Sequence, residues 1–210
     1  MTNDKENNWQ LFLCSGAEHL AGELRRAGFD TYTSGLNYDG SRFFANGDVY
    51  TRIAQIDEFH NRRVCIIQSL TSSGEADRFK FTSSDRVQEV LQVLQILREP
   101  TEVNYVDSVK EYHTGTRPRE ILIFCLHMAF SKQDQIYQTG EVNASKHVMD
   151  MFYHYGADRI AAIDPHVPPD FPWAQELIKQ RRFVIVSMSE QIVSEILQGH
   201  NMGDVFLVST

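Results

Sequence analysis

Short apolar runs alternate along this chain with longer segments in which apolar residues recur at helical spacing. The apolar runs are four or five residues long, which is typical of strands buried on both faces of a parallel sheet. The predicted strands are residues 11–14, 64–67, 121–125, 160–163, 183–186 and 205–208.

Helices are predicted between these strands. The clearest has apolar residues at 87, 90, 91, 94 and 97, an N-cap offered by Ser84-Asp85, and Pro100 just beyond its end. The others follow Ser15-Gly16 and end near Gly28, or cover residues 143–155, 171–180 and 189–198. Strands separated by helices of this length predict βαβ units, so the predicted fold class is α/β with a mostly parallel sheet.

Two segments depart from this alternation. Residues 42–53 are predicted to be an extended pair around Asn46-Gly47, a dipeptide that favours hairpin turns. Residues 101–118 are polar, contain Gly115 and Pro118, and are predicted to be irregular.

Composition narrows the class of protein. The formal net charge of −8 argues against a nucleic acid or an anionic membrane surface as partner, and no apolar run is long enough to span a bilayer. The polar start of the chain shows no export signal, and residues 1–9 are expected to be disordered. Cys14, Cys65 and Cys125 lie in or beside apolar runs with no metal-site spacing, so we expect buried, reduced thiols in a cytoplasmic protein.

Polar loops follow three of the predicted strands, at the sheet edge where α/β proteins bind ligands. The loop at 68–74 carries hydroxyls that could meet a phosphate or a sugar, although a simple polar turn would have the same composition. In the loop at 131–140, Lys132 and Gln133 could contact a polyphosphate, and Asp134 could orient Lys132 or hold a magnesium-bound water. Ordinary solvated loops have this composition too.

The third loop is Asp164-Pro165-His166. Its carboxylate and imidazole, held by the fixed backbone of the proline between them, could share one metal ion or one phosphate. Magnesium prefers oxygen ligands and accepts histidine less often. A histidine that caps the end of a strand is the other interpretation.

Seven short motifs occur in order between residues 12 and 166, within a similarity that runs from about residue 10 to residue 209. They are FLCSG at 12–16, FANGDVYTRI at 44–53, IIQS at 66–69, KQDQ at 132–135, EVNASK at 141–146, GADR at 156–159 and DPH at 164–166. In type and order they resemble the N-terminal half of the ribose-phosphate pyrophosphokinase (PRPP synthetase) family. This resemblance implies a phosphoribosyltransferase-like domain at residues 10–166 and the beginning of a second such domain at residues 167–210.

The family transfers pyrophosphate from Mg²⁺-ATP to ribose 5-phosphate, giving PRPP and AMP. The resemblance implies that Phe44, Asn46 and Asp48 contact adenine in the site of a neighbouring subunit, in a homo-oligomer or a hetero-oligomer with a related synthetase. It further implies that Lys132, Gln133 and Asp134 bind the ATP phosphates. By the same resemblance, His166 and Asp164 lie at the magnesium end of the nucleotide.

Departures from the family leave three functions open. Where the family has Arg-Gln-Asp-Arg, this chain has Lys132 and Gln135 in place of the two arginines. Lysine keeps the charge but cannot bind a phosphate through two parallel hydrogen bonds, and glutamine has no charge. The segment after His166 also differs from that of the family. The loops that bind ribose 5-phosphate belong to the family's second half, so we expect the 210-residue chain alone not to make PRPP. The chain could be part of a divergent synthetase, a non-catalytic paralogue that assembles with one, or a nucleotide-binding domain of unrelated function.

Overall fold

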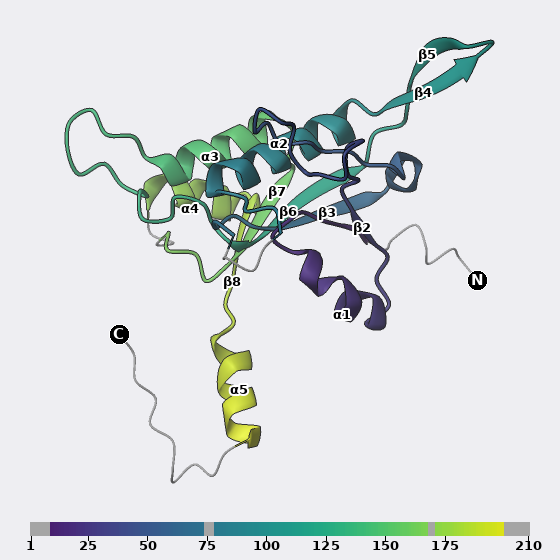
Figure 1. Ribbon diagram of the computed structural model, residues 1–210. Coiled ribbons are helices and arrows are strands. Elements are labelled where there is room, and N and C mark those ends of the chain that lie inside the picture. The colour runs from purple at the N-terminus through teal and green to yellow at the C-terminus, as the bar shows by residue number, and fades with distance from the viewer. Residues whose placement is uncertain (1–8, 74–77, 168–170, 200–210) are drawn as a thin grey trace.

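A six-stranded parallel sheet forms the centre of the molecule (Figure 1). The computed structural model describes residues 9–73, 78–167 and 171–199. The strand order is β2–β1–β3–β6–β7–β8, and each neighbouring pair is parallel. The strands are β1 (Trp9–Leu13), β2 (Thr31–Thr33), β3 (Arg63–Ser69), β6 (Glu120–His127), β7 (Arg159–Ile163) and β8 (Phe183–Val186). The α/β prediction is therefore confirmed.

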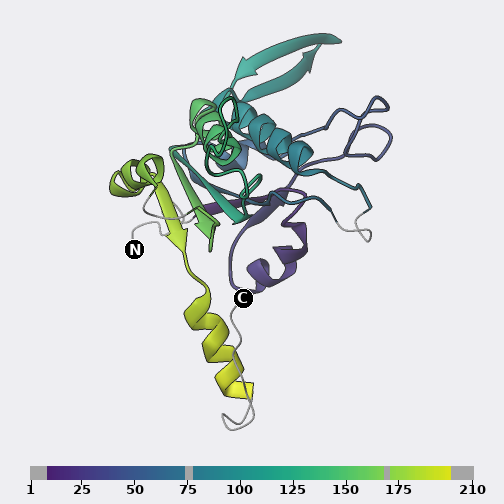
Figure 2. The ribbon, with the colours of Figure 1, turned by 90° about the vertical axis from the view of Figure 1, so that its left-hand side faces the viewer.

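Helices cover the two faces of this sheet unequally. Figure 2 shows α2 (Ser83–Arg98) and α3 (Ala144–His154) on one face, with α1 (Ala21–Arg26) on the other. The chain steps from β3 to β8 in one direction and from β1 to β2 in the opposite one, and right-handed crossovers therefore place the helices on opposite faces. The larger core lies under α2 and α3, and a smaller one lies under α1.

The remaining helices are short or lie at the edge of the sheet. Two 3-10 turns, η2 (Glu18–Leu20) and η3 (Ile56–Phe59), precede α1 and β3. α4 (Pro172–Lys179) leads to β8, and α5 (Ser189–Gly199) projects away from the sheet in both ribbon views (Figures 1 and 2). Within the described residues no helix combines the length and the apolar character that a membrane span requires.

The helix α2 begins earlier than its sequence pattern indicated. Its N-cap is Thr82, not Ser84-Asp85. The Thr82 hydroxyl accepts a hydrogen bond from the Asp85 backbone N–H, and the Asp85 carboxylate accepts one from the Thr82 N–H. This is a capping box, and it satisfies two backbone donors that the first turn of a helix leaves free.

The prediction that residues 101–118 are irregular was wrong. β4 (Thr101–Val106) and β5 (Val109–Thr114) form an antiparallel hairpin that projects from the body (Figure 1). Asp107 and Ser108 at its tip have φ of 50° and 66°, and this pair of positive values is typical of a two-residue type I′ turn. Both faces of this hairpin are solvent-exposed, so its strands carry polar side chains on both sides. The sequence therefore lacks the alternation of apolar and polar residues by which a half-buried strand is predicted.

The turn predicted at Asn46-Gly47 is present, but the strands on either side of it are not. Gly47 has φ of 91° and donates its N–H to the Phe44 carbonyl. A single antiparallel bridge joins Phe43 to Val49. The segment is therefore a tight exposed loop.

Some sequence predictions concern the ends of the described regions. Trp9, which was included in the segment expected to be disordered, is the first residue of β1, and residues 1–8 lie outside the described residues. The predicted boundary after residue 166 falls between β7 and α4, and β8 beyond it extends the same sheet. The strand predicted at 205–208 lies outside the described residues.

The three cysteines are buried and free, as expected. Burial raises the pKa of the Cys65 and Cys125 thiols to about 12, and burial with the nearby Glu89 carboxylate raises that of Cys14. A thiol held protonated in this way is a poor nucleophile and a poor metal ligand.

A network of buried charged and polar side chains joins α2 to the carboxyl ends of β1 and β3. Glu89 is almost completely buried and accepts hydrogen bonds from the Ser15 N–H, the Ser15 hydroxyl and the Gln68 amide. The buried Arg42 guanidinium lies 3.7 Å from Glu89 and also pairs with Glu18. Burial raises the pKa of Glu89, although these hydrogen bonds and the Arg42 charge oppose the shift.

We expect Glu89→Gln to destabilise the protein by about 1–3 kcal/mol at acid pH, because it replaces one acceptor of this network by a donor. The ordinary pKa of a glutamate carboxyl group is 4.5, and folding raises it for Glu89. The stability that the protonated group contributes is fully present below pH 4.5, and it is lost as the pH rises through the pKa of the folded state. The stability difference between wild type and Glu89→Gln should therefore shrink as pH rises. Urea unfolding at a series of pH values measures it.

Glu23→Gln is the matched control. The Glu23 carboxylate is exposed, and its ion pair with Arg26 is a weak one, because its closest distance to the Arg26 guanidinium is 3.9 Å. Its stability difference should stay near zero across the same pH range. A difference for Glu89→Gln that grows with pH would contradict the raised pKa.

Candidate functional site

The crevice where α/β sheets most often bind ligands is filled in this protein. The order β2–β1–β3 puts the topological switch point between β1 and β3. There the Gly16 N–H donates to the Gln68 side chain (2.7 Å), and both Ser15 donors are taken by Glu89. A Cβ atom on Gly16 would lie 2.6 Å from the Arg86 guanidinium and from the Ser69 carbonyl. The Gly16 N–H and both Ser15 donors are therefore already used within the protein.

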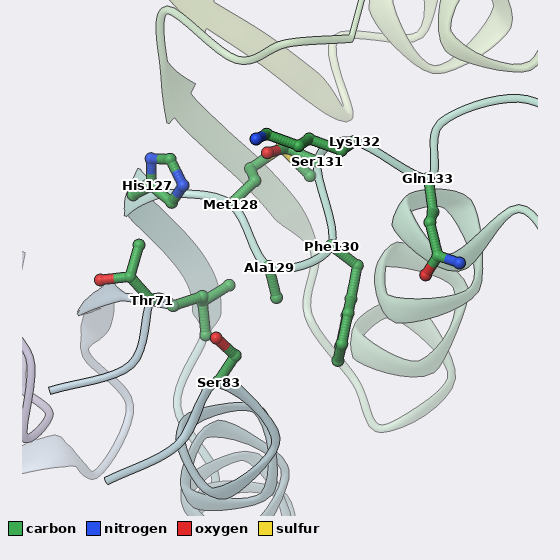
Figure 3. Close-up of a pocket in the computed structure, with 10 residues that line it drawn as sticks. Thr71, Ser83, His127, Met128, Ala129, Phe130, Ser131, Lys132 and Gln133 are labelled. Carbon is green, nitrogen blue, oxygen red and sulfur yellow. The ribbon is translucent and has the colours of Figure 1, made fainter. Parts of the chain in front are cut away.

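A pocket of about 330 Å³ opens instead between the carboxyl ends of β3 and β6 (Figure 3). One wall is the loop that follows β6, and the other is formed by residues after β3 and by the start of α2. Its lining residues are Leu70, Thr71, Ser83, His127, Met128, Ala129, Phe130, Ser131, Lys132 and Gln133. Two of the loops singled out in the sequence, 68–74 and 131–140, therefore meet in one pocket.

The start of α2 gives this pocket a favourable end for an anion. Ser83 is the first residue of a 16-residue helix, and its side chain lines the pocket, as does that of Thr71 (Figure 3). The Ser83 hydroxyl lies 3.5 Å from that of Ser72, and the Thr71 hydroxyl lies 3.4 Å from that of Ser69. The N-terminus of a helix carries a partial positive charge and unpaired N–H groups, which favour phosphate. The Asp85 carboxylate in the capping box reduces this partial charge.

The loop after β6 is held by the first turn of α3. The Ser145 hydroxyl donates to the Phe130 carbonyl (2.8 Å), and the Asn143 side chain donates to the Asp134 carbonyl. Asn143 also caps α3 by accepting from the Lys146 N–H. Phe130 has φ of 52°, a backbone conformation that costs energy in a non-glycine residue and is maintained here by these hydrogen bonds.

Lys132 and Gln133 are exposed at the rim of the pocket but point in different directions. The Lys132 side chain runs back along the loop toward His127, whereas Gln133 points away from it (Figure 3). One phosphate could reach Lys132 from inside the pocket. Gln133 would meet a different part of a ligand.

Asp134 is paired with His166, a contact that the sequence did not reveal. Its side chain is 2% exposed and one carboxylate oxygen lies 3.1 Å from His166 Nδ1, while the other oxygen is buried without a hydrogen-bond partner. The His166 ring itself is 65% exposed. A carboxylate on Nδ1 fixes the ring and leaves Nε2 facing solvent, an arrangement that proteins use for imidazoles that bind metals or anions. Asp134 thus orients His166, and in the part of the chain that the structure describes it forms its ion pair with His166 and not with Lys132.

Asp164 has a structural role in this conformation. It has φ of 35°, and its carboxylate accepts a hydrogen bond from the Met188 N–H (3.0 Å), which ties the end of β7 to the segment after β8. Within the described residues it does not form a three-ligand cluster with Asp134 and His166.

Phe44, Asn46 and Asp48 lie on the exposed loop and do not line the pocket. Phe44 packs edge-on against Tyr50, and the Asn46 amide donates to the Asp48 carboxylate (2.6 Å). The neighbouring Phe43 packs on Phe81, just before α2. Any ligand contact made by these three residues is therefore separate from the pocket.

Comparisons with known proteins relate this fold to solved structures. No protein-family model matches the chain, and no curated protein matches it in sequence. A solved structure, phosphoribosylpyrophosphate synthetase from Mycobacterium smegmatis, superposes with a TM-score of 0.62 at 16% identity. The match covers 92% of this chain and 53% of that one, so this chain spans about half the length of that synthetase. The fold is that of a PRPP synthetase-like domain.

The groups present fit a magnesium–phosphate ligand in part. Lys132, the hydroxyls of Thr71 and Ser83 and the N-terminus of α2 suit phosphate oxygens. The free face of His166 and the unpartnered oxygen of Asp134 suit a metal-bound water or a phosphate more than a direct magnesium bond, because the oxygen is buried.

We expect the Asp134–His166 pair to show energetic coupling in a double-mutant cycle. His166→Ala leaves a buried carboxylate without its partner and should destabilise the protein by about 1–3 kcal/mol. In an Asp134→Asn background the same change should cost less, because no buried charge remains. Urea unfolding of the four proteins gives the coupling. Equal costs in both backgrounds would show that the exposed ring contributes nothing to holding Asp134.

Proposed function

We propose that the pocket between β3 and β6 binds the phosphates of Mg²⁺-ATP, as part of a PRPP synthetase-like protein that transfers pyrophosphate to ribose 5-phosphate. The proposal is carried by one observation, which is that Lys132 and the N-terminus of α2 line the same pocket at the carboxyl edge of the sheet. The fold shared with a phosphoribosylpyrophosphate synthetase supports it.

In this proposal the chain contributes binding and orientation. Lys132 neutralises phosphate charge, and Thr71 and Ser83 donate hydrogen bonds. His166, held by Asp134, does not line the pocket, so its Nε2 would meet the phosphate chain or its metal outside the pocket. Bound magnesium would supply further charge neutralisation. Phosphoryl and pyrophosphoryl transfer depend mainly on such positioning and neutralisation, so these residues would serve as the nucleotide half of a catalytic site.

The size of the pocket bears on how the nucleotide is held. A volume of about 330 Å³ is at the lower end for small-molecule sites, so we infer that it receives phosphates and part of the ribose. Adenine would then lie outside the pocket, against the Phe44, Asn46 and Asp48 loop of a neighbouring subunit. The 43% exposure of Phe44 leaves its ring available for such stacking.

A second candidate function is a non-catalytic paralogue that binds nucleotide and assembles with a complete synthetase. Specific observations favour it. Lys132 is the one lysine or arginine among the lining residues of the pocket, Gln133 points away from it, and the Asp164 carboxylate is bonded to Met188 (Figure 3).

We expect weak, magnesium-dependent binding of ATP, measured by calorimetric titration. Lys132→Ala removes a charge-assisted hydrogen bond, which contributes about 1.5–3 kcal/mol, so affinity should fall roughly 10- to 100-fold. His166→Ala should also weaken binding, and more so with magnesium than without it. Lys110→Ala is the matched control, because Lys110 is fully exposed on the projecting hairpin.

ATP binding that is equally strong in wild type and Lys132→Ala would rule out the pocket as the phosphate site. No binding by the wild type at millimolar ATP would rule out both candidate functions.

We expect self-association that depends on the segment 42–53. If Phe44 completes a neighbour's adenine site, Phe44→Ala should weaken the oligomer, and ATP should strengthen it in the wild type only. Sedimentation velocity over a range of concentrations measures both effects. Tyr38→Ala is a suitable control, because Tyr38 is 92% exposed on a nearby turn. A wild-type monomer unchanged by ATP would count against assembly through this loop.

A further inference from the structure

Three side chains of types that bind metals lie close together near the amino ends of β3 and β6, at the opposite end of these strands from the proposed nucleotide pocket. Asp57 and His60 lie on and just after η3, which precedes the amino end of β3, and Glu102 lies on β4 at the base of the projecting hairpin. Each offers one ligand atom, and these atoms all lie within 4.8 Å of one another. We propose that Asp57, His60 and Glu102 bind a divalent transition metal of the zinc class.

The distances suit a shared metal better than hydrogen bonds. His60 Nε2 lies 3.8 Å from Glu102 Oε1 and 3.9 Å from Asp57 Oδ1, too far for a hydrogen bond to either oxygen. Zinc binds histidine nitrogen and carboxylate oxygen at about 2.0–2.2 Å, so tetrahedral ligands lie roughly 3.3–3.5 Å apart. Side-chain rotation of the two carboxylates would have to bring the ligand atoms, which now lie within 4.8 Å of one another, to that separation.

The imidazole nitrogen at the centre of the cluster is buried and has no hydrogen-bond partner. A buried nitrogen of this kind costs free energy unless something satisfies it, and a metal ion does so directly. The His60 side chain as a whole is 24% exposed, although Nε2 itself is buried. The Asp57 carboxylate is largely exposed and free to turn toward an ion.

Gly115, at the end of the hairpin, keeps space open beside these ligand atoms. A Cβ atom at this position would lie 2.8 Å from His60 Nε2 and 3.0 Å from Glu102 Oε1. Its φ is not in the left-handed region, so backbone conformation does not require a glycine here. The requirement is for room next to His60 and Glu102.

The ligand set selects the class of metal. One imidazole and two carboxylates match zinc and similar transition metals, whereas magnesium and calcium prefer oxygen ligands alone. The two carboxylates also provide two negative charges for a divalent cation. Water would complete the coordination on the exposed side.

A metal at this place would fix the hairpin to the body. Two-stranded hairpins are only marginally stable by themselves, and every residue of β5 is exposed. The bridge from η3 to Glu102 would restrain β4 at its base, where the Gly115 N–H already donates to the Pro100 carbonyl. Bound metal should therefore slow hydrogen exchange along residues 101–114.

The test uses the full chain, stripped of metal with a chelator and titrated with zinc sulfate in a calorimeter. We expect saturable binding of one zinc ion per chain and much weaker binding of magnesium. His60→Ala and Glu102→Gln should each lower zinc affinity by roughly tenfold or more, since changes even in outer-shell partners cost that much. Hydrogen exchange at 101–114 should slow with zinc in the wild type but not in either variant.

His113→Ala is the matched control. His113 lies across from Glu102 in the hairpin register, but its Nε2 faces Glu111 at 3.5 Å, outside the proposed ligand set. Zinc affinity that falls as far in this variant as in His60→Ala would overturn the assignment. So would the absence of saturable zinc binding, or equal binding by wild type and His60→Ala. ATP binding should be unchanged in His60→Ala, so the outcome is independent of the proposed nucleotide function.

Discussion

The parallel pairing of β3 with β6 is the constraint on which the rest of the structure depends. It forms the centre of the sheet, and it continues past the strands, because the Leu70 N–H donates to the His127 carbonyl. The loops after the two strands are therefore fixed side by side, although nearly sixty residues separate them in sequence. Thr71 and Lys132 line one pocket for this reason, and the first turn of α3 then fixes the loop that carries Lys132.

Buried charge determines which part of the carboxyl edge remains open. Glu89 and Arg42 use the donors and acceptors of Ser15 and Gln68 and fill the switch point between β1 and β3. Leaving either charge unpaired inside the protein would cost several kcal/mol, so the network is not readily displaced by a ligand. The available site is consequently one strand further along the sheet.

The pocket offers a nucleotide few charged groups. Lys132 is the one lysine or arginine among its lining residues, and the exposed loop with Phe44 is separate from it. The chain spans about half the length of a structurally similar synthetase. At the other end of the sheet, Asp57 and His60 of the body lie close to Glu102 at the base of the projecting hairpin.

The alternation of apolar runs and helical patterns was sufficient to predict the α/β class, the strands β1, β3, β6, β7 and β8 and the helices between them, because burial on both faces leaves a strong periodic signal. It missed β2 (Thr31–Thr33), a three-residue strand at the side of the sheet whose residues are only partly buried. It missed the β4–β5 hairpin, whose exposed strands bury nothing, and misplaced the start of α2 by two residues. It marked Lys132, Asp134 and His166 as polar residues after strands. Only the tertiary structure paired Asp134 with His166, turned Gln133 away and gave Asp164 a bond to Met188. Such contacts join residues 24 to 32 positions apart, and local sequence does not determine side-chain direction across that distance.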